Sequence, residues 1–393
     1  MFEIQKPNSL PIKIWLKSLD LLEPECLQQI YNIAQFPFAF HHIAIMPDAH
    51  TGYGMPIGGV LATKDVVIPH AVGVDIGCGM CTVKTSLTEI DRYTLEDILQ
   101  KIRNKIPIGF KHHKLNQSEK FMPQKPSISG QSIVREEYQS ALSQIGTLGG
   151  GNHFIEIQKG NDGHIWIMVH SGSRNIGYKV ANHYNKLAKK INEKYNEKVS
   201  IPRAWDLAYL FVESKEGQDY LKEMNFCIDF AFASRKLMMD VTKSIFKNFP
   251  PSITFDEMIN IAHNYASEEK HFGQTVWVHR KGATQAQKGQ IGIIPGSQGT
   301  SSFIVIGKGS PDSFSSCSHG AGRVMSRHRA IKELNLQYEI TKMEQKGILH
   351  SIRRRKDLDE ASSAYKNIDV VIANQKDLID ILVQLNPLAV VKG

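Results

Sequence analysis

The sequence lacks the features that would place it in several common protein classes. No uncharged apolar run in its 393 residues reaches the roughly 18 residues that a membrane helix needs, so we expect no membrane contact. Residues 1–15 lack the continuous apolar stretch and small-residue cleavage site of a signal peptide. The five cysteines are odd in number and scattered, unlike a disulfide framework. These absences predict a cytoplasmic protein.

Two common nucleotide-binding fingerprints are also missing. The sequence contains no GxxxxGK[ST] phosphate loop, and no GxGxxG motif follows a predicted strand to open a helix. Any nucleotide must therefore be bound by a different arrangement. Fixed-period repeats and long low-complexity linkers are absent as well, so no segment marks a boundary between independent domains.

Composition indicates a globular chain. Hydrophobic residues make up 41% and charged residues 22%, which supplies a sizeable core and argues against wholesale disorder. The formal net charge is +8 at pH 7, from 47 basic and 39 acidic residues. This excess suits a polyanionic partner without requiring one.

Glycine is concentrated in three blocks. Of the 30 glycines, 25 lie within residues 52–82, 146–177 and 273–322, where the backbone must turn tightly or approach another group closely. Short β-branched runs in these blocks predict strands at 58–69, 154–158, 165–170, 275–280 and 302–309. Apolar residues at helical spacing predict helices over 180–195 and 226–245. Further helices are predicted over 94–105, 131–145, 254–264, 321–335 and 375–384.

These elements predict an α+β fold. The preferred picture is one compact catalytic domain over residues 1–393, whose sheet core is built from the separated glycine-rich segments. A helical insertion at about 180–262 interrupts it.

The first block contains a pair of candidate metal ligands. Asp75 and Cys78 lie on a glycine-rich turn, where a carboxylate and a thiolate can converge on one cation. Taken alone, the pair is explained equally well without a metal, as an aspartate in a turn and a cysteine buried in the core. The spacing Cys78-x-x-Cys81 would suit half a zinc knuckle or a redox pair, but no second CxxC motif exists.

Histidines in the other two blocks extend this set. His153 follows three glycines and Asn152, His170 ends the apolar run IWIMV, and His263 precedes Asn264. Each alone is compatible with an ordinary structural histidine. With Asp75 and Cys78 they suffice for a mixed nitrogen, oxygen and sulfur site, large enough for two metals if Cys78 bridges them. Ligand softness alone favours zinc.

A possible nucleophile and phosphate contacts follow in the third block. His319 precedes three small residues and a helix predicted from about 323, so its imidazole is expected near a helix N-terminus that favours anions. Arg323 and Arg327 are then one helical turn apart. The loop PGSQG suits either a ligand-wrapping loop or a simple turn, and Arg174 in SGSR either a phosphate contact or a surface arginine.

Nine motifs, in the same order, resemble those of RtcB-type RNA ligases. They are MPDAHTGYGMPIGGV, VGVDIGCG, GGGNHFIE, HSGSR, HNYA, RKGAT, IPGS, SCSHGAGRVMSR and the terminal VVKG. The match extends from about residue 42 to the last residue. This family joins RNA 3′-phosphate or 2′,3′-cyclic phosphate ends to 5′-hydroxyl ends. It uses GTP and Mn²⁺ and passes through a covalent histidine–GMP intermediate.

The resemblance implies a role for individual residues. Asp75, Cys78 and His153 would bind one Mn²⁺, and Cys78, His170 and His263 the other, so that Cys78 bridges two manganese ions rather than zinc. His319 would be the guanylylated nucleophile. The guanylate pocket would contain Asn152, His153, Phe154, Ile155, Glu156, His263, Asn264, Pro295, Gly296, Ser297, Gln298, Ser302, His319, Gly320, Ala321, Gly322 and Lys392.

Basic residues near these motifs are candidates for RNA phosphate contacts. We expect this role for Arg174, Lys281 and Arg327. The basic run 353–356 would either extend the RNA footprint or form a solvated face.

Four positions depart from the usual family pattern. Val74 and Gly77 replace a tyrosine and an asparagine before the bridging cysteine, Gln285 replaces an arginine, and Gln298 replaces a methionine. Because no expected ligand or nucleophile is lost, these changes bear on substrate preference and loop packing. They suggest a divergent paralogue.

The sequence therefore predicts a GTP-dependent RNA ligase of repair or tRNA splicing, with two Mn²⁺ per active site. One alternative is a dinuclear metal-dependent RNA phosphoesterase, which would need the metals but not His319. A second is a non-ligating RNA-binding paralogue, against which the intact ligand set argues. RNA with the ends named above is the expected partner, an archease-like activator is compatible with the family, and monomer is the default state.

Overall fold

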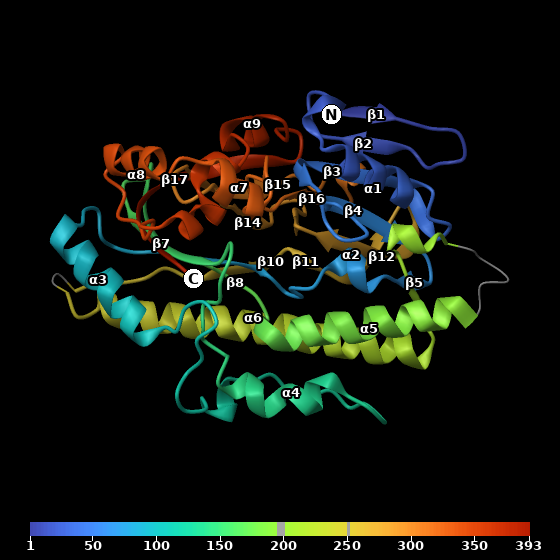
Figure 1. Cartoon of the computed structure of the whole chain (residues 1–393), viewed down its shortest axis with the longest axis horizontal. Helices are drawn as coiled ribbons and strands as arrows, with labels where there is room; N and C mark the ends of the chain where they lie inside the picture. Colours follow the sequence, from blue (N-terminus) through green and yellow to red (C-terminus); the bar gives the residue numbers. More distant parts are fainter. Residues whose placement is uncertain (195–200, 250–251) are drawn as a thin grey trace.

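Strands from distant parts of the sequence form two large sheets at the centre of the molecule (Figure 1). The computed structural model describes residues 1–194, 201–249 and 252–393, and within them one sheet has six strands and the other seven. The six-stranded order is β1 (Phe2–Ile4), β2 (Ile12–Ile14), β3 (Ala39–His50), β4 (Ile57–Thr63), β12 (Gln274–Lys281), β11 (Asn264–His271). The seven-stranded order is β10 (Ile259–Ala262), β6 (Gly79–Lys84), β8 (Ile165–Ser171), β7 (Phe154–Gly160), β17 (Ile379–Lys392), β15 (Ser302–Gly307), β14 (Ile291–Ile294).

Two short ribbons complete the strand pairing. One joins β5 (Val66–Val67) to β9 (Leu210–Phe211), and the other joins β13 (Ala283–Gln285) to β16 (Ser316–Ser318). The helices are α1 (Pro24–Ala34), α2 (Pro69–Val72), α3 (Arg92–Lys105), α4 (Ile133–Leu142), α5 (Arg174–Lys194), α6 (Lys215–Phe246), α7 (Arg327–Glu333), α8 (Leu336–Gln345) and α9 (Ile368–Ala373). This mixture of helices with separate sheets confirms the predicted α+β class.

The seven-stranded sheet has one face toward helices and another toward the cleft described below. Successive side chains of a strand point to opposite faces. In β8, Ile167 and Val169 therefore pack with α3 and α6 in one buried cluster, while Met168 and His170 point the other way. His170 thus stands on the face that the helices leave uncovered.

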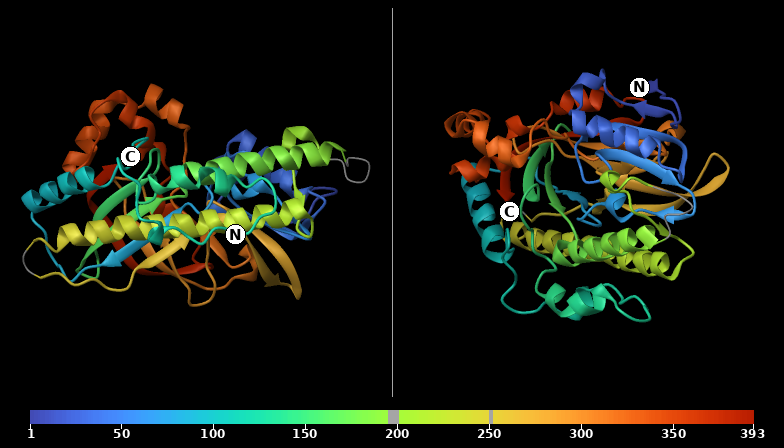
Figure 2. Two further views of the ribbon diagram at one scale, coloured as in Figure 1. Left: turned by 90° about the horizontal axis from the view of Figure 1, so that it is seen from below. Right: turned by 45° about the vertical axis from the view of Figure 1, so that its right-hand side comes forward.

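Two long helices lie side by side beneath this sheet (Figures 1 and 2). Val180 and Tyr184 of α5 and Phe226 and Phe230 of α6 belong to one buried cluster, to which Tyr138 of α4 also contributes. Their i, i+4 spacing gives each helix a single apolar stripe, which is buried against its neighbours. None of the helices in the described ranges combines the length and apolarity needed to cross a bilayer.

Separate clusters hold the rest of the molecule together. Ala44, Val60 and Val278 of the six-stranded sheet pack against Phe303 and Val305 of β15, which joins the two sheets. On the other face of the six-stranded sheet, α1 covers β2 to β4 in a further buried cluster. The cleft therefore lies between two sheets that share a core.

The predicted strands are confirmed. The runs 58–69, 154–158, 165–170, 275–280 and 302–309 fall on β4 with β5, β7, β8, β12 and β15. The helices predicted at 94–105, 131–145, 180–195 and 226–245 correspond to α3, α4, α5 and α6, although Tyr195 lies outside the described residues. The single domain over 1–393 and its insertion at about 180–262 stay predictions.

Two predicted helices are wrong. Residues 254–264 contain β10, because the polar Asn260 alternates with Ile259 and Ile261, and these residues pair with β6. The range 375–384 contains the start of β17, which is recruited between β7 and β15. Short apolar runs do not distinguish a strand from a helix. In both segments, pairing with distant strands determines the secondary structure.

The helix predicted at 321–335 is confirmed in part, because α7 covers Arg327–Glu333 but begins later than expected. The backbone of Val324 donates instead to the carbonyl of Ala364, and Arg323 forms a bridge with Tyr365. Ser326 then caps α7 by accepting from the backbone N–H of Arg329.

Candidate active site

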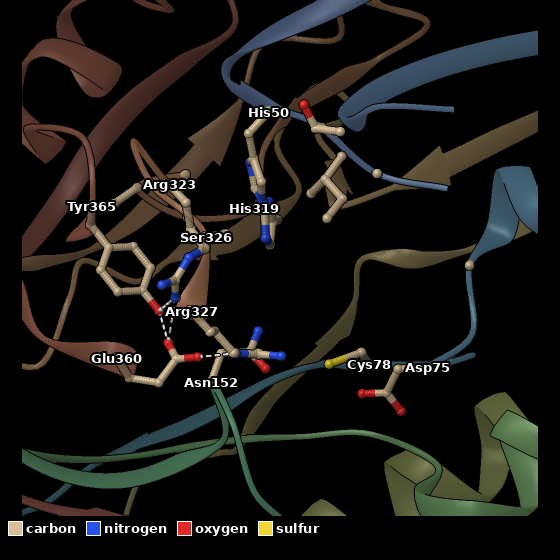
Figure 3. Close-up of a pocket in the computed structure, with 18 of the residues that line it drawn as sticks. His50, Asp75, Cys78, Asn152, His319, Arg323, Ser326, Arg327, Glu360 and Tyr365 are labelled. Carbon is tan, nitrogen blue, oxygen red and sulfur yellow. Dashed lines mark hydrogen bonds and ion pairs between the residues drawn. The ribbon is translucent and has the colours of Figure 1, made fainter. Parts of the chain in front are cut away.

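A cleft of 1260 Å³ is lined by residues from all three glycine-rich blocks (Figure 3). Asp75 and Cys78 stand on one side of it, and Arg327, Glu360 and Tyr365 stand on the other. The clustering of glycine in the sequence therefore corresponds to segments that meet in space.

Asp75, Cys78 and His153 form the first of two groups that could hold a metal ion. Their ligand atoms lie within 4.8 Å of one another. His153 Nε2 is 3.1 Å from Asp75 Oδ2 and 3.5 Å from Cys78 Sγ. The Nδ1 of His153 faces the carbonyl of Leu148 at 3.0 Å, so this nitrogen donates and Nε2 keeps its lone pair for a cation.

Cys78, His170 and His263 form the second group, which shares the thiol with the first. Their ligand atoms also lie within 4.8 Å of one another, and Cys78 Sγ is 3.3 Å from His170 Nε2. His170 donates from Nδ1 to the carbonyl of Asn152 at 3.1 Å, which again orients Nε2 toward the thiol. The structure thus brings together all five residues expected as ligands, with Cys78 in the shared position.

Strand ends and their pairing hold these groups. Cys78 precedes β6, and its carbonyl accepts from the backbone N–H of His263, which follows β10. Asn264 donates to the carbonyl of Asp75 and accepts from the backbone of Gly282. Paired strands therefore fix the spacing of residues that are far apart in sequence.

The chemistry of these donors fits a divalent cation. His263 Nδ1 is buried without a hydrogen-bond partner among the described residues, which is costly unless another group satisfies it. Burial raises the pKa of the Cys78 thiol well above its usual value and holds the pKa of His170 and of His263 well below theirs. Without a cation these three groups are neutral, and a bound dication would deprotonate the thiol.

His319 lies beside the second group and is oriented by a carboxylate. Its Nδ1 is 2.6 Å from Oδ2 of Asp48, which also accepts from the backbone N–H groups of His319 and Gly320. Asp48 is completely buried. The rings of His319 and His263 have centroids 4.8 Å apart. Because Nδ1 donates to Asp48, Nε2 carries the lone pair, as a nucleophilic imidazole requires.

The chain after His319 differs from the predicted helix N-terminus. Because α7 starts at Arg327, no helix begins next to His319. The immediate partner of the His319 ring is the carboxylate of Asp48, and not the free backbone N–H groups of a helix N-terminus. Gly322 adopts φ +72°, and a Cβ there would lie 2.1 Å from the carbonyl oxygen of Asp48. Glycine is required at this position because the turn passes directly over the strand that carries Asp48.

Most of the expected guanylate residues line the cleft. These are Asn152, His153, Phe154, His263, Asn264, Pro295, Gly296, Ser297, Gln298, His319, Gly320, Ala321, Gly322 and Lys392. Lys392 comes from β17 and donates to the carbonyl of Gly151. The side chain therefore lies on a paired strand, next to the loop that carries Asn152.

Three expected guanylate residues do not line the cleft. Ile155 is buried in the core against α3 and α6, because it alternates with Phe154 along β7 and points to the opposite face. Glu156 and Ser302 lie behind the lining, where both contact the side chain of Gln158. Burial raises the pKa of Glu156 to about 8, so this carboxyl is largely protonated at neutral pH.

An ionic cluster forms the wall opposite Asp75 and Cys78 (Figure 3). Glu360 accepts from Arg323 at 3.0 Å, from Arg327 at 2.6 Å and from the hydroxyl of Tyr365. Burial would raise the pKa of Glu360, but Lys392 and the two arginines lower it to about 2. Arg323 and Arg327 thus share one carboxylate, although they do not share a helical face.

The three expected RNA contacts occupy different environments. Lys281 and Arg327 line the cleft. The guanidinium of Arg174 lies over Gly149 and 3.4 Å from His153 Nδ1, outside the residues that line the cleft. Burial lowers the pKa of Lys281 to about 7 and also lowers that of Arg174.

The four departures from the family pattern are spread over the site. Val74 and Gln298 line the cleft, and Gln298 donates to the backbone carbonyl of Glu360. Gly77 donates from its backbone to the carbonyl of Asn264. Gln285 lies farther away, where it donates to Glu269.

Sequence reasoning missed several residues of this site. Asp48, within the motif MPDAH, has no predicted role, although a lone carboxylate inside an apolar strand is a usable signal. His50, Glu360 and Tyr365 also line the cleft. No local pattern identifies Glu360, because its partners Arg323 and Arg327 lie in a distant segment.

Comparisons with known proteins agree with the resemblance noted from the motifs. The family model described as tRNA-splicing ligase RtcB matches residues 29–127 and 122–393. The RNA-splicing ligase RtcB of Escherichia coli K12 is 38% identical to this chain over the full length of both. The tRNA-splicing ligase RtcB of Nanoarchaeum equitans is 31% identical over 100% of this chain and 98% of its own length. The Pyrobaculum aerophilum protein of the same name is 30% identical over 98% and 95%.

Proposed function

This chain belongs to the RtcB family of RNA-splicing ligases, and on that premise we propose that it seals RNA in a GTP-dependent reaction. Its substrates would be an RNA end bearing a 3′-phosphate or 2′,3′-cyclic phosphate and a second end bearing a 5′-hydroxyl. The observation that carries the proposal is the placement of His319, oriented by Asp48 and directly beside the Cys78–His170–His263 group in one cleft.

The first step uses His319 as a nucleophile. Its Nε2 attacks the α-phosphorus of GTP, a P–N bond forms, and pyrophosphate leaves. Asp48 holds the imidazole through Nδ1 and stabilises the positive charge that the ring acquires, as a carboxylate does behind other nucleophile-associated histidines.

Two further steps transfer the guanylate and join the strands. An oxygen of the RNA 3′-phosphate attacks the guanylate phosphorus, and the P–N bond to His319 breaks. The 5′-hydroxyl then attacks the activated 3′-phosphate, forming the new phosphodiester and expelling GMP. A cyclic phosphate would first be opened by water to a 3′-phosphate.

Asp75, Cys78 and His153 would hold one divalent cation, and Cys78, His170 and His263 the second. Bound there, the cations would stabilise negative charge on phosphate oxygens. Manganese is proposed from the family resemblance, since donor softness alone favours zinc. A cytoplasmic location, a monomeric state and an archease-like activator stay predictions from sequence.

Labelling with GTP carrying a radioactive α-phosphate tests the proposal. In the presence of Mn²⁺ we expect a protein–GMP adduct that is acid-labile and base-stable, and no adduct with His319→Ala. Joining of a 3′-phosphate RNA to a 5′-hydroxyl RNA, scored on several broken tRNA and rRNA substrates, should show the same dependence. Equal labelling of wild type and His319→Ala contradicts the assignment of the nucleophile.

The alternative of a metal-dependent phosphoesterase predicts a different outcome. Such an enzyme would open cyclic phosphates equally well without His319 and would form no adduct. Asp48 is buried and orients His319, a residue that the phosphoesterase would not need. This arrangement favours the ligase.

A further inference from the structure

Lys366 lies behind the cleft, next to the pair formed by His319 and Asp48. It follows Tyr365, which lines the cleft, but Lys366 itself is outside the residues that line it. Its side chain is part-buried. Removing an ammonium group from water costs free energy unless partners compensate it, so the contacts of this lysine indicate what it does. The steps described above give it no role.

The ammonium group of Lys366 holds the backbone on both sides of Asp48. Its Nζ donates to the carbonyl of Ala49 at 2.5 Å and to that of Pro47 at 3.3 Å. Both residues are buried, and buried carbonyl groups require a hydrogen-bond partner. The two bonds therefore restrain the residue that lies between these carbonyls, which is Asp48.

The strand needs this support because its pairing is irregular where Asp48 lies. Strand β3 pairs with β4 at Ile45 and again at His50, and the register shifts between these two residues. Within this interval the carbonyl of Asp48 accepts from Nδ1 of His50. Side-chain donors thus bind the backbone carbonyls in a stretch where the regular ladder is interrupted.

The backbone of Lys366 holds the other half of the pair. Its N–H donates to the carbonyl of Gly322 at 2.9 Å, in the turn that follows His319. This turn passes directly over Asp48, because a Cβ at Gly322 would lie 2.1 Å from the carbonyl oxygen of Asp48. One residue is therefore bonded both to the strand that carries Asp48 and to the turn that carries His319.

Lys366 also places a positive charge near the buried carboxylate. Oδ2 of Asp48 accepts from His319, whereas Oδ1 is buried without a hydrogen-bond partner among the residues that the structure describes. Burial lowers the pKa of Lys366, and attraction to the Asp48 carboxylate opposes that shift. The ammonium group is thus close enough to Asp48 to offset part of the cost of burying its charge.

We propose that Lys366 is a positioning residue for the His319 nucleophile, acting through Asp48. By fixing the strand on one side and the turn on the other, it sets the contact between Asp48 Oδ2 and His319 Nδ1. Its effect belongs to the transfer of guanylate to and from His319, because the joining step does not use this ring. The inference rests on the proposed ligase function and adds a residue to its first step.

Two assays with full-length protein separate positioning from general damage to the fold. Single-turnover labelling with radioactive GTP and Mn²⁺ measures the step that uses His319. Joining of purified RNA with a guanylylated 3′-end, made by wild-type protein without a 5′-hydroxyl strand, measures the step that does not.

Lys366→Met keeps the aliphatic stem and removes the ammonium group. We expect it to lower the maximal labelling rate by about 10²-fold, because a small misplacement of a reacting group has an effect of this size. The half-saturating GTP concentration should not change, since the lysine does not touch the nucleotide. The rate of joining should equal that of the wild type.

Lys366→Arg and Lys308→Met serve as companion variants. Lys366→Arg retains a cation with donors for both carbonyls and should recover about 10-fold of the lost labelling rate. Lys308 lies outside the residues that line the cleft, and its Nζ also donates to a backbone carbonyl, that of Lys376 at 2.7 Å. Lys308→Met removes the same kind of bond and should label at the wild-type rate.

Two results would overturn the inference. One is labelling by Lys366→Met at the wild-type rate. The other is an equal loss of labelling and of joining, which would mean that the lysine supports the fold and not the nucleophile. If thermal unfolding shows that Lys366→Met does not fold, Lys366→Gln, which keeps a donor but loses the charge, is judged by the same two results. If the wild type itself forms no adduct, the proposed function fails, which is a separate result.

Discussion

Nδ1 of His319 and Oδ2 of Asp48 form a hydrogen bond of 2.6 Å that joins two segments far apart in the sequence. The same carboxylate oxygen accepts from the backbone at His319 and Gly320, so it fixes both the ring and the turn that carries it. Asp48 thereby determines which nitrogen of the His319 ring carries the lone pair.

Asp48→Asn should slow formation of the GMP adduct by roughly 10²- to 10⁴-fold, because a neutral amide supports the charged imidazole less well. Initial rates of GTP labelling measure this effect. Asp240→Asn, on the exposed side of α6, should label at the wild-type rate. Labelling of Asp48→Asn at that rate would contradict the role given to the carboxylate.

Cys78→Ala should lose both metal ions together, since the thiol belongs to both ligand groups. Metal content after gel filtration in Mn²⁺ measures the loss. Cys81→Ala is the matched control, because that thiol packs in the core on the helix side of β6. Retention of one full manganese equivalent by Cys78→Ala would exclude a bridging thiolate.

Glu156→Gln should flatten the pH dependence of stability. Burial raises the pKa of Glu156 from 4.5 to about 8, so the folded state keeps a proton that the unfolded state releases. The contribution of Glu156 to the free energy of unfolding is fully present below about pH 4.5. It falls by up to roughly 1.4 kcal/mol per pH unit as the pH rises toward 8. Thermal unfolding between pH 5 and 8.5 measures it. Parallel curves for wild type and Glu156→Gln would disprove the buried protonated state.

Arg235→Met should lower the free energy of unfolding by about 2–5 kcal/mol. Arg235 is completely buried in α6 and donates to the carbonyls of Gly77 and Ser171 and to Asn260, which methionine would leave unpaired. Lys236→Met changes the next residue, whose exposed ion pair should contribute about 0.5 kcal/mol or less. Denaturant unfolding compares the two variants. Equal stabilities would mean that water satisfies these carbonyls.

The sequence predicts the residues of the two candidate metal groups. It does not predict the hydrogen bonds that orient their side chains. Asp75, Cys78 and the three histidines were found because glycine turns beside strand-like runs are visible locally. Their partners, such as the carbonyls of Leu148 and Asn152, depend on loop conformations that no spacing encodes.

The errors have a common physical origin. The motif GGGNHFIE predicts Ile155 in the guanylate pocket with its neighbours, but the two-residue period of β7 turns it to the other face. The segments 254–264 and 375–384 contain only short apolar runs, and their secondary structure is decided by the distant strands that pair with them. Glu360 is likewise defined by partners far away in sequence.

The position of β17 has a consequence for how the protein acquires its shape. This strand pairs with β7 on one side and β15 on the other, and neither neighbour is close to it in sequence. Such pairing must bridge long stretches of chain, which makes it entropically expensive and slow. Until β17 docks, the seven-stranded sheet exists as two separate pieces with unpaired edges. Lys392, which β17 carries, therefore reaches the cleft only when this long-range pairing has formed.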